Sequence, residues 1–315
     1  MPFGPAGALA LAGAMAVVLC GCGLGPGPAP SAVKLLVTRE FGARTLRVVA
    51  APRVVGQETV MRLLMRNASV QTRYSGGFVQ SIDGVSGGRE GGEPVDWFYY
   101  VNGVEAPKGA SATTVNPGDH IWWDLHDWSE SEDVPAVVGS FPEPFLNGVQ
   151  GKRLPVLIEC EAVGGYACRT IDARLRALDV PAAIAAPNAT PASDTLRVLV
   201  GTWQTVSHDP VATALAQGPR GSGVYARFAP GGGSLALLGQ DGATVRTLYG
   251  DSGLVAATRR EEEAPVWVVT GTDQAGVDTA AASFDGESLQ GHFAVAVGGG
   301  SQGPIPLPAG GGFAR

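Results

Sequence analysis

Aromatic residues are concentrated in residues 96–128, a stretch that begins DWFYYVNGVE and ends HIWWDLHDW. Its 33 positions hold four Trp, two Tyr and one Phe, although the 315-residue chain contains only 22 aromatic residues. Asn102-Gly103 suits a tight hairpin turn, because both residues tolerate positive φ. Pro117-Gly118 suits a type II turn, with Pro and Gly at its two central positions. The stretch therefore predicts aromatic strands joined by tight turns.

Alternation along the strand expected at residues 121–125 assigns its side chains to two faces. One face carries Ile121, Trp123 and Leu125. We expect this face to form the core over a short helix, because a domain of about 100 residues needs large side chains to bury enough area. Trp122 lies on the other face, where we expect an exposed ring that can stack on a flat ligand, together with Trp128 and Tyr100. The alternative is that these rings pack against the rest of the chain.

Three possible metal ligands share the face of Trp122, namely His120, Asp124 and His126. At about 3.3 Å per residue, His120 and His126 lie roughly 20 Å apart along one strand, so they cannot bind one ion. Asp124 and His126 alone are too few ligands. We therefore expect no metal site here.

The segment WFYYVNGVEAPKGASATTVNPGDHIWWDL resembles the transcobalamin-like C-terminal domain family, filed as domain of unknown function 4430. The matching positions are Trp97, Tyr100, Val101, Asn102, Gly103, Gly109, Ala110, Ser111, Val115, Pro117, Gly118, Asp119, Ile121, Trp122 and Trp123. The upstream ETVMRLL and GGFVQSIDGV segments fall where the family has them, so the resemblance covers residues 32–128. It implies a β-grasp domain similar to the one that ends the vitamin B12 carriers. A cobalamin-like or other flat cofactor is the ligand that the resemblance suggests.

The rest of this first domain fits the same plan. Residues 33–51 alternate well enough for two strands joined at Phe41-Gly42-Ala43. ETVMRLLMRNASV has apolar residues at helical spacing, and Thr59 suits its N-cap. With a short strand near residues 75–88, the order is β-β-α-β-β-β. We expect residues 32–128 to fold without the rest of the chain.

The first 33 residues carry no charged side chain. GALALAGAMAVVLC has the length of a signal-peptide core and is too short to span a bilayer. The sequence Leu19-Cys20-Gly21-Cys22 resembles a bacterial lipobox, which implies a lipid on Cys22. Residues 1–22 are then a lipoprotein signal peptide and residues 23–31 a tether, which places the chain on the extracytoplasmic face of the cell membrane. The alternative is an ordinary signal peptide cleaved elsewhere.

The remaining two cysteines, Cys160 and Cys168, lie close together in the chain. An exported protein meets oxidants, so we expect a disulfide between them. The alternative is a metal-binding pair, but no further Cys or nearby His completes it.

Residues 129–152 hold three Pro without a clear period and predict a linker or an irregular connection. In residues 153–298, apolar strands are repeatedly followed by helices, which favours a second, α/β domain with a partly parallel sheet. The segment between residues 224 and 250 predicts antiparallel hairpins. DPVATALAQ predicts a helix that begins at Asp209. Residues 299–315 predict a flexible Gly/Pro tail. The fold class is therefore α+β, with a β-grasp-like domain followed by an α/β domain.

The formal net charge of −7 argues against a nucleic-acid partner, whose phosphates require a basic patch. No nucleophile elbow, nucleotide-binding motif or pair of carboxylates in an apolar setting points to catalysis, so we do not expect an enzyme. We expect a lipid-anchored protein that binds a small ligand or assists an envelope partner. The alternative is a structural or interaction module of the cell envelope without a small ligand.

Overall fold

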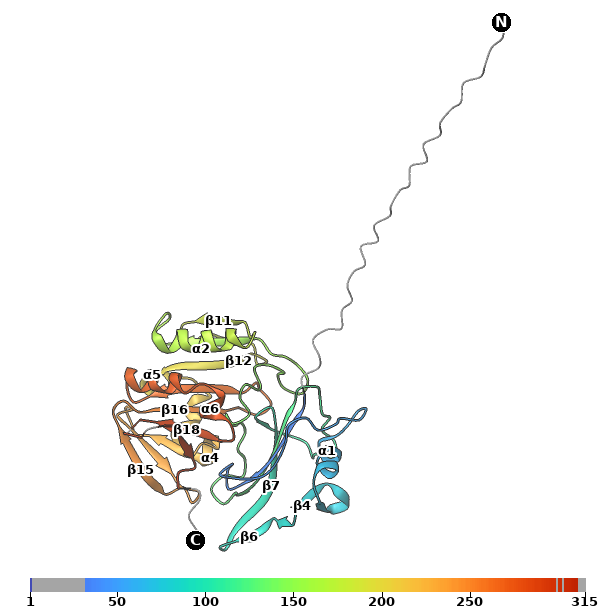
Figure 1. Ribbon diagram of the computed structural model, residues 1–315. Helices are drawn as coiled ribbons and strands as arrows, with labels where there is room; N and C mark the ends of the chain where they lie inside the picture. The colour runs from blue at the N-terminus through green and yellow to red at the C-terminus, as the bar shows by residue number, and fades with distance from the viewer. Residues whose placement is uncertain (2–31, 299, 302, 311–315) are drawn as a thin grey trace. The chain divides into compact units, whose positions relative to one another are not determined.

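The structure of the protein is a computed structural model (Figure 1). It describes residue 1 and residues 32–298, 300–301 and 303–310, so the candidate signal peptide and tether, with Cys22, lie outside the described residues. From residue 32 onward the described residues form one compact unit. An N-terminal mixed sheet with a helix precedes a second, mixed α/β sheet region. The predicted α+β fold class is therefore confirmed.

The first sheet contains six strands. Their order is β2 (Arg44–Val49), β1 (Lys34–Arg39), β9 (His120–Asp127), β7 (Glu93–Val101) and β6 (Gly88–Glu90), with β8 (Val104–Glu105) also paired to β7. The pair β1–β9 is parallel and the other pairs are antiparallel. The predicted turn between β1 and β2 is confirmed, with Phe41 at φ 57° and Gly42 at φ 84°.

Helix α1 (Val60–Asn67) covers one face of this sheet. The Thr59 side chain accepts a hydrogen bond from the Arg62 backbone N–H at 3.4 Å, which confirms Thr59 as the N-cap. The buried side of the helix shares a core with Ile121, Trp123 and Leu125, as the alternation predicts. A small antiparallel sheet, which the sequence indicated only in part, follows α1: β3 (Val70–Arg73), β4 (Phe78–Ile82) and β5 (Val85–Ser86).

The second sheet contains seven strands. Their order is β11 (Ala182–Ala185), β10 (Val156–Cys160), β12 (Leu196–Thr202), β17 (Val266–Gly271), β16 (Gly253–Thr258), β18 (Ala294–Val297) and β19 (Ile305–Leu307). The first four strands are parallel and the remaining pairs are antiparallel, so the predicted partly parallel sheet is confirmed. Helices α2 (Tyr166–Ala177) and α5 (Gln274–Ala282) follow β10 and β17, contact each other and bury their apolar sides in one core (Figure 1).

The opposite face of the second sheet is covered by α3 (Trp203–Val206), by a 3-10 helix η2 (Ala212–Gln217), by α4 (Pro219–Ser222) and by a three-stranded sheet. That sheet consists of β13 (Ala226–Phe228), β14 (Ser234–Leu238) and β15 (Thr244–Tyr249), which confirms the predicted hairpins. The helix expected from Asp209 is the short η2. Asp209 accepts from the backbone N–H groups of Val211 at 2.9 Å and Ala212 at 3.2 Å, and Gly218 at φ 66° ends the turn.

The connection at residues 129–152 is irregular, but it is not a free linker. Val134 and Val137 are buried in the core on one face of the second sheet, and Phe141 and Phe145 in the core on the other face. The tail prediction is wrong where the chain is described, because β19 lies within it and pairs with β18. Pro306 is accommodated because β19 is an edge strand.

Candidate functional site

Two of the three rings that the sequence placed on a ligand-stacking surface are buried. Trp122 and Tyr100 are both 0 % exposed. The indole Nε1 of Trp122 donates to Thr38 Oγ1 at 2.7 Å, and its ring centroid lies 5.1 Å from that of Phe293. The prediction that Trp122 is exposed is therefore wrong. The alternation of side chains along β9 assigned its two faces correctly. It could not show that residues near 293, far away in the sequence, cover the face that carries Trp122.

This contact between the two sheets, which we call the seam, consists of Phe41, Tyr100, Trp122, Tyr225 and Phe293 with their polar neighbours. The imidazole of His126 stacks between Phe41 and Phe98, at centroid distances of 4.5 and 4.4 Å. Its Nδ1 lies 2.9 Å from Asp124 Oδ2. Asp124 also accepts from the backbone N–H groups of Phe41 and Gly42 at 3.0 Å. These polar groups satisfy one another inside the seam.

No cluster of three or more His, Cys, Asp or Glu suited to a metal ion occurs in the part of the chain that the structure describes. Trp128 is half-buried, and its Nε1 donates to Asp96 Oδ2 at 3.1 Å. Part of the Trp128 ring remains accessible. The role of Trp128 in ligand binding stays a prediction.

A cleft of about 230 Å³ opens beside the β7–β8 hairpin. Its lining residues are Val101, Val104, Glu105, Ala106, Pro107, Lys108, Ala112, Thr113, Thr114, Asn116, Val149, Gln150 and Arg259. Ten of these 13 residues lie between residues 101 and 116. None of the three rings that we predicted as ligand contacts lines it. The cleft combines apolar side chains with a few polar and charged groups, as small-molecule sites do.

The predicted Asn102-Gly103 turn positions the cleft. Asn102 has φ 55° and Gly103 has φ 77°, and Asn102 is completely buried. The Asn102 side chain donates to Asp119 Oδ1 at 2.9 Å and to the Gly148 carbonyl at 2.8 Å, and accepts from the His120 backbone N–H at 2.8 Å. These bonds fix the hairpin to the following loop and to the connection. A Cβ on Gly103 would lie 2.7 Å from the Val137 carbonyl oxygen, so this position requires glycine.

Glu105 joins three parts of the chain at the cleft. Its Oε2 accepts from the Val134 backbone N–H at 3.0 Å, and its own N–H donates to the Pro135 carbonyl at 3.2 Å. Arg259 Nη2 donates to its carbonyl oxygen at 3.1 Å. Burial, followed by the nearby charge of Asp133, raises the pKa of Glu105 to about 8. The carboxyl group is therefore mostly protonated at neutral pH.

Arg259 and Lys108 supply positive charge to the cleft. Burial lowers the pKa of Arg259, but a guanidinium stays protonated at physiological pH. Lys108 is exposed. Within the described part of the chain, neither side chain forms a salt bridge.

Sequence reasoning missed this site. Glu105 and Lys108 lie within the five residues after the Asn102-Gly103 turn. Charged residues at this place in an aromatic stretch are a signal that could have identified them. Arg259 lies 154 residues away from Glu105 along the chain, so only the fold brings the two together.

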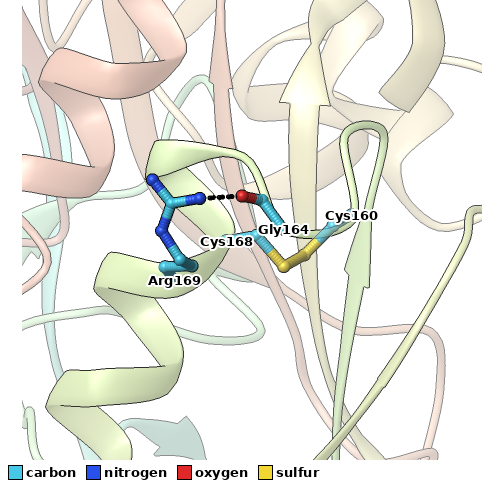
Figure 2. Close-up of a disulfide and its surroundings, with 4 residues drawn as sticks. All are labelled: Cys160, Gly164, Cys168 and Arg169. Carbon is cyan, nitrogen blue, oxygen red and sulfur yellow. Dashed lines mark hydrogen bonds between the residues drawn. A yellow bond between two sulfur atoms is a disulfide. The ribbon is translucent and has the colours of Figure 1, made fainter.

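The predicted disulfide is present between Cys160, at the end of β10, and Cys168, in α2 (Figure 2). Both cysteines are buried, and Arg169 donates to the Gly164 carbonyl within the loop that they close. Asp273 is the N-cap of α5, because its side chain accepts from the Gly276 N–H at 2.8 Å.

One comparison with known proteins identifies a family within the first sheet region. Residues 57–127 match the family described as domain of unknown function DUF4430, so the chain carries a DUF4430 domain there. The crystal structure of a protein from Ruminococcus gnavus that is described as metal-binding is similar at 16 % identity with a TM-score of 0.25. The match covers 31 % of this chain and 97 % of that chain.

No match was found among curated proteins. Within the described residues, no helix is long and apolar enough to cross a membrane.

Proposed function

We propose that this chain is an exported, lipid-anchored protein that binds a small ligand in the cleft around Glu105, Lys108 and Arg259. The cleft itself is the observation that carries the proposal. Its walls come mostly from the DUF4430 domain, while Arg259 comes from the second sheet region. Ionisable groups that converge on a partly apolar hollow are the usual form of a small-molecule site.

One feature of the sequence and one of the structure support export. The Leu19-Cys20-Gly21-Cys22 segment resembles a lipobox, and the Cys160–Cys168 disulfide suits an oxidising compartment. A lipid on Cys22 would anchor the chain without a spanning helix.

The geometry favours a ligand smaller than a corrinoid. The rings that could have stacked on a flat macrocycle, Trp122 and Tyr100, are buried in the seam. The cleft of about 230 Å³ lies below the roughly 300–1,000 Å³ of drug-sized sites. We therefore propose a small polar ligand rather than a cobalamin-like cofactor.

A structural or interaction module of the cell envelope is the second candidate function. The burial of Trp122 and Tyr100 favours it, because these two rings then serve the core and not a ligand. Under this second candidate function, the cleft binds no ligand.

Mass spectrometry of small molecules that co-purify with the full-length chain from its native host separates the two candidates. The variant Ala112→Trp fills the cleft from an exposed position, and Ala50→Trp adds the same ring at an exposed position that does not line the cleft. We expect a compound that is retained by the native chain and by Ala50→Trp and lost from Ala112→Trp. A compound retained equally by all three proteins, or none with any of them, supports the second candidate.

The anchoring part of the proposal has a separate test. The variant Cys22→Ser cannot accept a thioether-linked lipid. It should remain unprocessed, and its partitioning between detergent and water should differ from that of the native chain. Normal processing and unchanged membrane retention of Cys22→Ser would contradict a lipid anchor at this residue.

A further inference from the structure

We infer that the ligand of the cleft is a small anion, a carboxylate or a phosphate, held between the guanidinium of Arg259 and the ammonium group of Lys108. The inference rests on the proposed function, since it names the chemistry of the same cleft.

The charges at the cleft are unbalanced. Arg259 and Lys108 form no salt bridge within the described chain, whereas buried or half-buried arginines elsewhere are paired, such as Arg39 with Glu90 and Arg197 with Glu159. Glu105 is the single carboxyl group among the lining residues. Its position in a partly desolvated corner, with Asp133 nearby, keeps it mostly protonated at neutral pH. The lining therefore carries two cations and little negative charge.

Two further carboxylates lie near Arg259 without lining the cleft. Asp133 and Glu262 act on Arg259 through their charges and favour its protonated form, but neither approaches it within salt-bridge distance. Both are exposed, so solvent screens their charges. An anion inside the cleft would approach Arg259 more closely than either of them and could accept a bidentate hydrogen bond.

Neutral donors and apolar walls complete the cleft. The side chains of Thr114 and Gln150 make no hydrogen bond to another described residue, so both can donate to a ligand. The Thr113 hydroxyl is already engaged by Tyr99, and the Asn116 amide by Asp119. Val101, Val104 and Val149 provide surface for an apolar portion. A cationic ligand would meet two like charges here, which disfavours it.

Binding of a matched set of probes to the full-length chain tests the inference. Benzoate, benzamide and benzylamine have nearly the same size and differ in charge, and inorganic phosphate and succinate separate phosphate from carboxylate recognition. Dissociation constants at pH 7 by calorimetry or ligand-observed NMR should show binding of benzoate or of one of the other anions, and weaker binding of benzamide and benzylamine.

The variants locate the anion. Arg259→Gln should weaken anion binding about tenfold or more, the loss expected for a charge-assisted hydrogen bond, and Lys108→Gln should weaken it less because Lys108 is exposed. Arg260→Gln removes the same charge from the next residue, which is exposed and does not line the cleft, and should change little. Arg259→Lys keeps the charge and should retain part of the affinity, which controls for lost packing.

The outcomes are distinguishable. Anion binding that is weakened by Arg259→Gln but not by Arg260→Gln supports the inference. Equal binding of benzamide or benzylamine that is blocked by Ala112→Trp overturns the anion but leaves a small-ligand site. Anion binding that neither Arg259→Gln nor Lys108→Gln weakens, or no anion binding at millimolar concentration, overturns the inference, while co-purification decides the proposed function separately.

Discussion

At the scale of single residues, Trp122 shows how tightly the seam is packed. A Cβ on Gly139 would lie 2.6 Å from the indole of Trp122, and a Cβ on Gly42 would lie 3.1 Å from it. The backbone therefore approaches the ring from two sides, and glycine permits both approaches. The ring is fixed between the two sheets and has no surface left for a ligand.

Trp122→Ala should lower the free energy of unfolding by about 3–5 kcal/mol, as expected for truncation of a buried large ring. Trp123→Ala should cost a similar amount, because Trp123 is buried on the opposite face of the same strand. Chemical denaturation of both variants checks this. Trp128→Ala is the control and should cost clearly less, since that ring is half-buried. If Trp122→Ala lowered the free energy of unfolding as little as Trp128→Ala does, the result would contradict the burial of Trp122 in the seam.

Glu105 should make the stability of the chain depend on pH. Its pKa is about 8 in the folded chain and near its ordinary value of 4.5 when unfolded. The charges of Asp133 and Arg259 act on it, Lys108 lines the same cleft, and the charge of Glu105 acts on the Tyr100 hydroxyl. Its stabilising contribution is complete below about pH 4.5 and is lost as the pH rises through about 8, because folding then has to bury the ionised form.

The variant Glu105→Gln lacks this titration. Between pH 5 and pH 9, the native chain should therefore lose at least ~1 kcal/mol more stability than Glu105→Gln, the equivalent of one pKa unit. Denaturant unfolding at several pH values measures the difference. Parallel pH profiles of the two proteins would mean that Glu105 titrates normally.

At the scale of elements, the disulfide ties the start of α2 to the end of β10. Replacing both Cys160 and Cys168 with Ala should lower the free energy of unfolding by about 2–3 kcal/mol, from the chain-entropy estimate for a short loop. Calorimetry in the presence and absence of a reducing agent checks this. The native chain should respond to reduction and the double variant should not. A native chain that is insensitive to reduction would show that its cysteines are free.

Elements were predictable from the sequence where local chemistry determines them. The Thr59 cap, the Asn102-Gly103 turn and the strand–helix pairs β10–α2 and β17–α5 all follow from short segments. Short strands such as β3 and β19 were missed, because pairing with a neighbour rather than their own pattern stabilises them. The cleft could not be predicted for the same reason, since Arg259 reaches Glu105 only through the packing of the two sheets.

At the scale of the whole molecule, the two sheet regions share a core. Phe41, Tyr100 and Trp122 from the first region are buried in one cluster with Tyr225 and Phe293 from the second. The connection at residues 129–152 adds side chains to both cores of the second sheet. The Arg259 wall of the cleft depends on this arrangement, so ligand binding should require both regions.

The shared core changes the expectation for a fragment of residues 32–128. Such a fragment would expose Tyr100 and Trp122, which are 0 % exposed in the full chain, and a continuous aromatic patch favours association. We expect it to aggregate or to bind a hydrophobic dye strongly, whereas residues 32–310 should not. Light scattering and dye fluorescence measure both. A soluble, monomeric fragment with cooperative unfolding would show that the first region folds by itself.

The central claim is that the cleft beside the β7–β8 hairpin is the ligand site. Its most direct test is NMR mapping of the isotope-labelled chain during titration with the co-purifying compound, or with benzoate. We predict shifts in the backbone amides of Glu105, Lys108, Thr114, Gln150 and Arg259, and none from these ligands in Ala112→Trp. Shifts confined to the seam, or to the carboxyl ends of β10, β12 and β17, would contradict the claim.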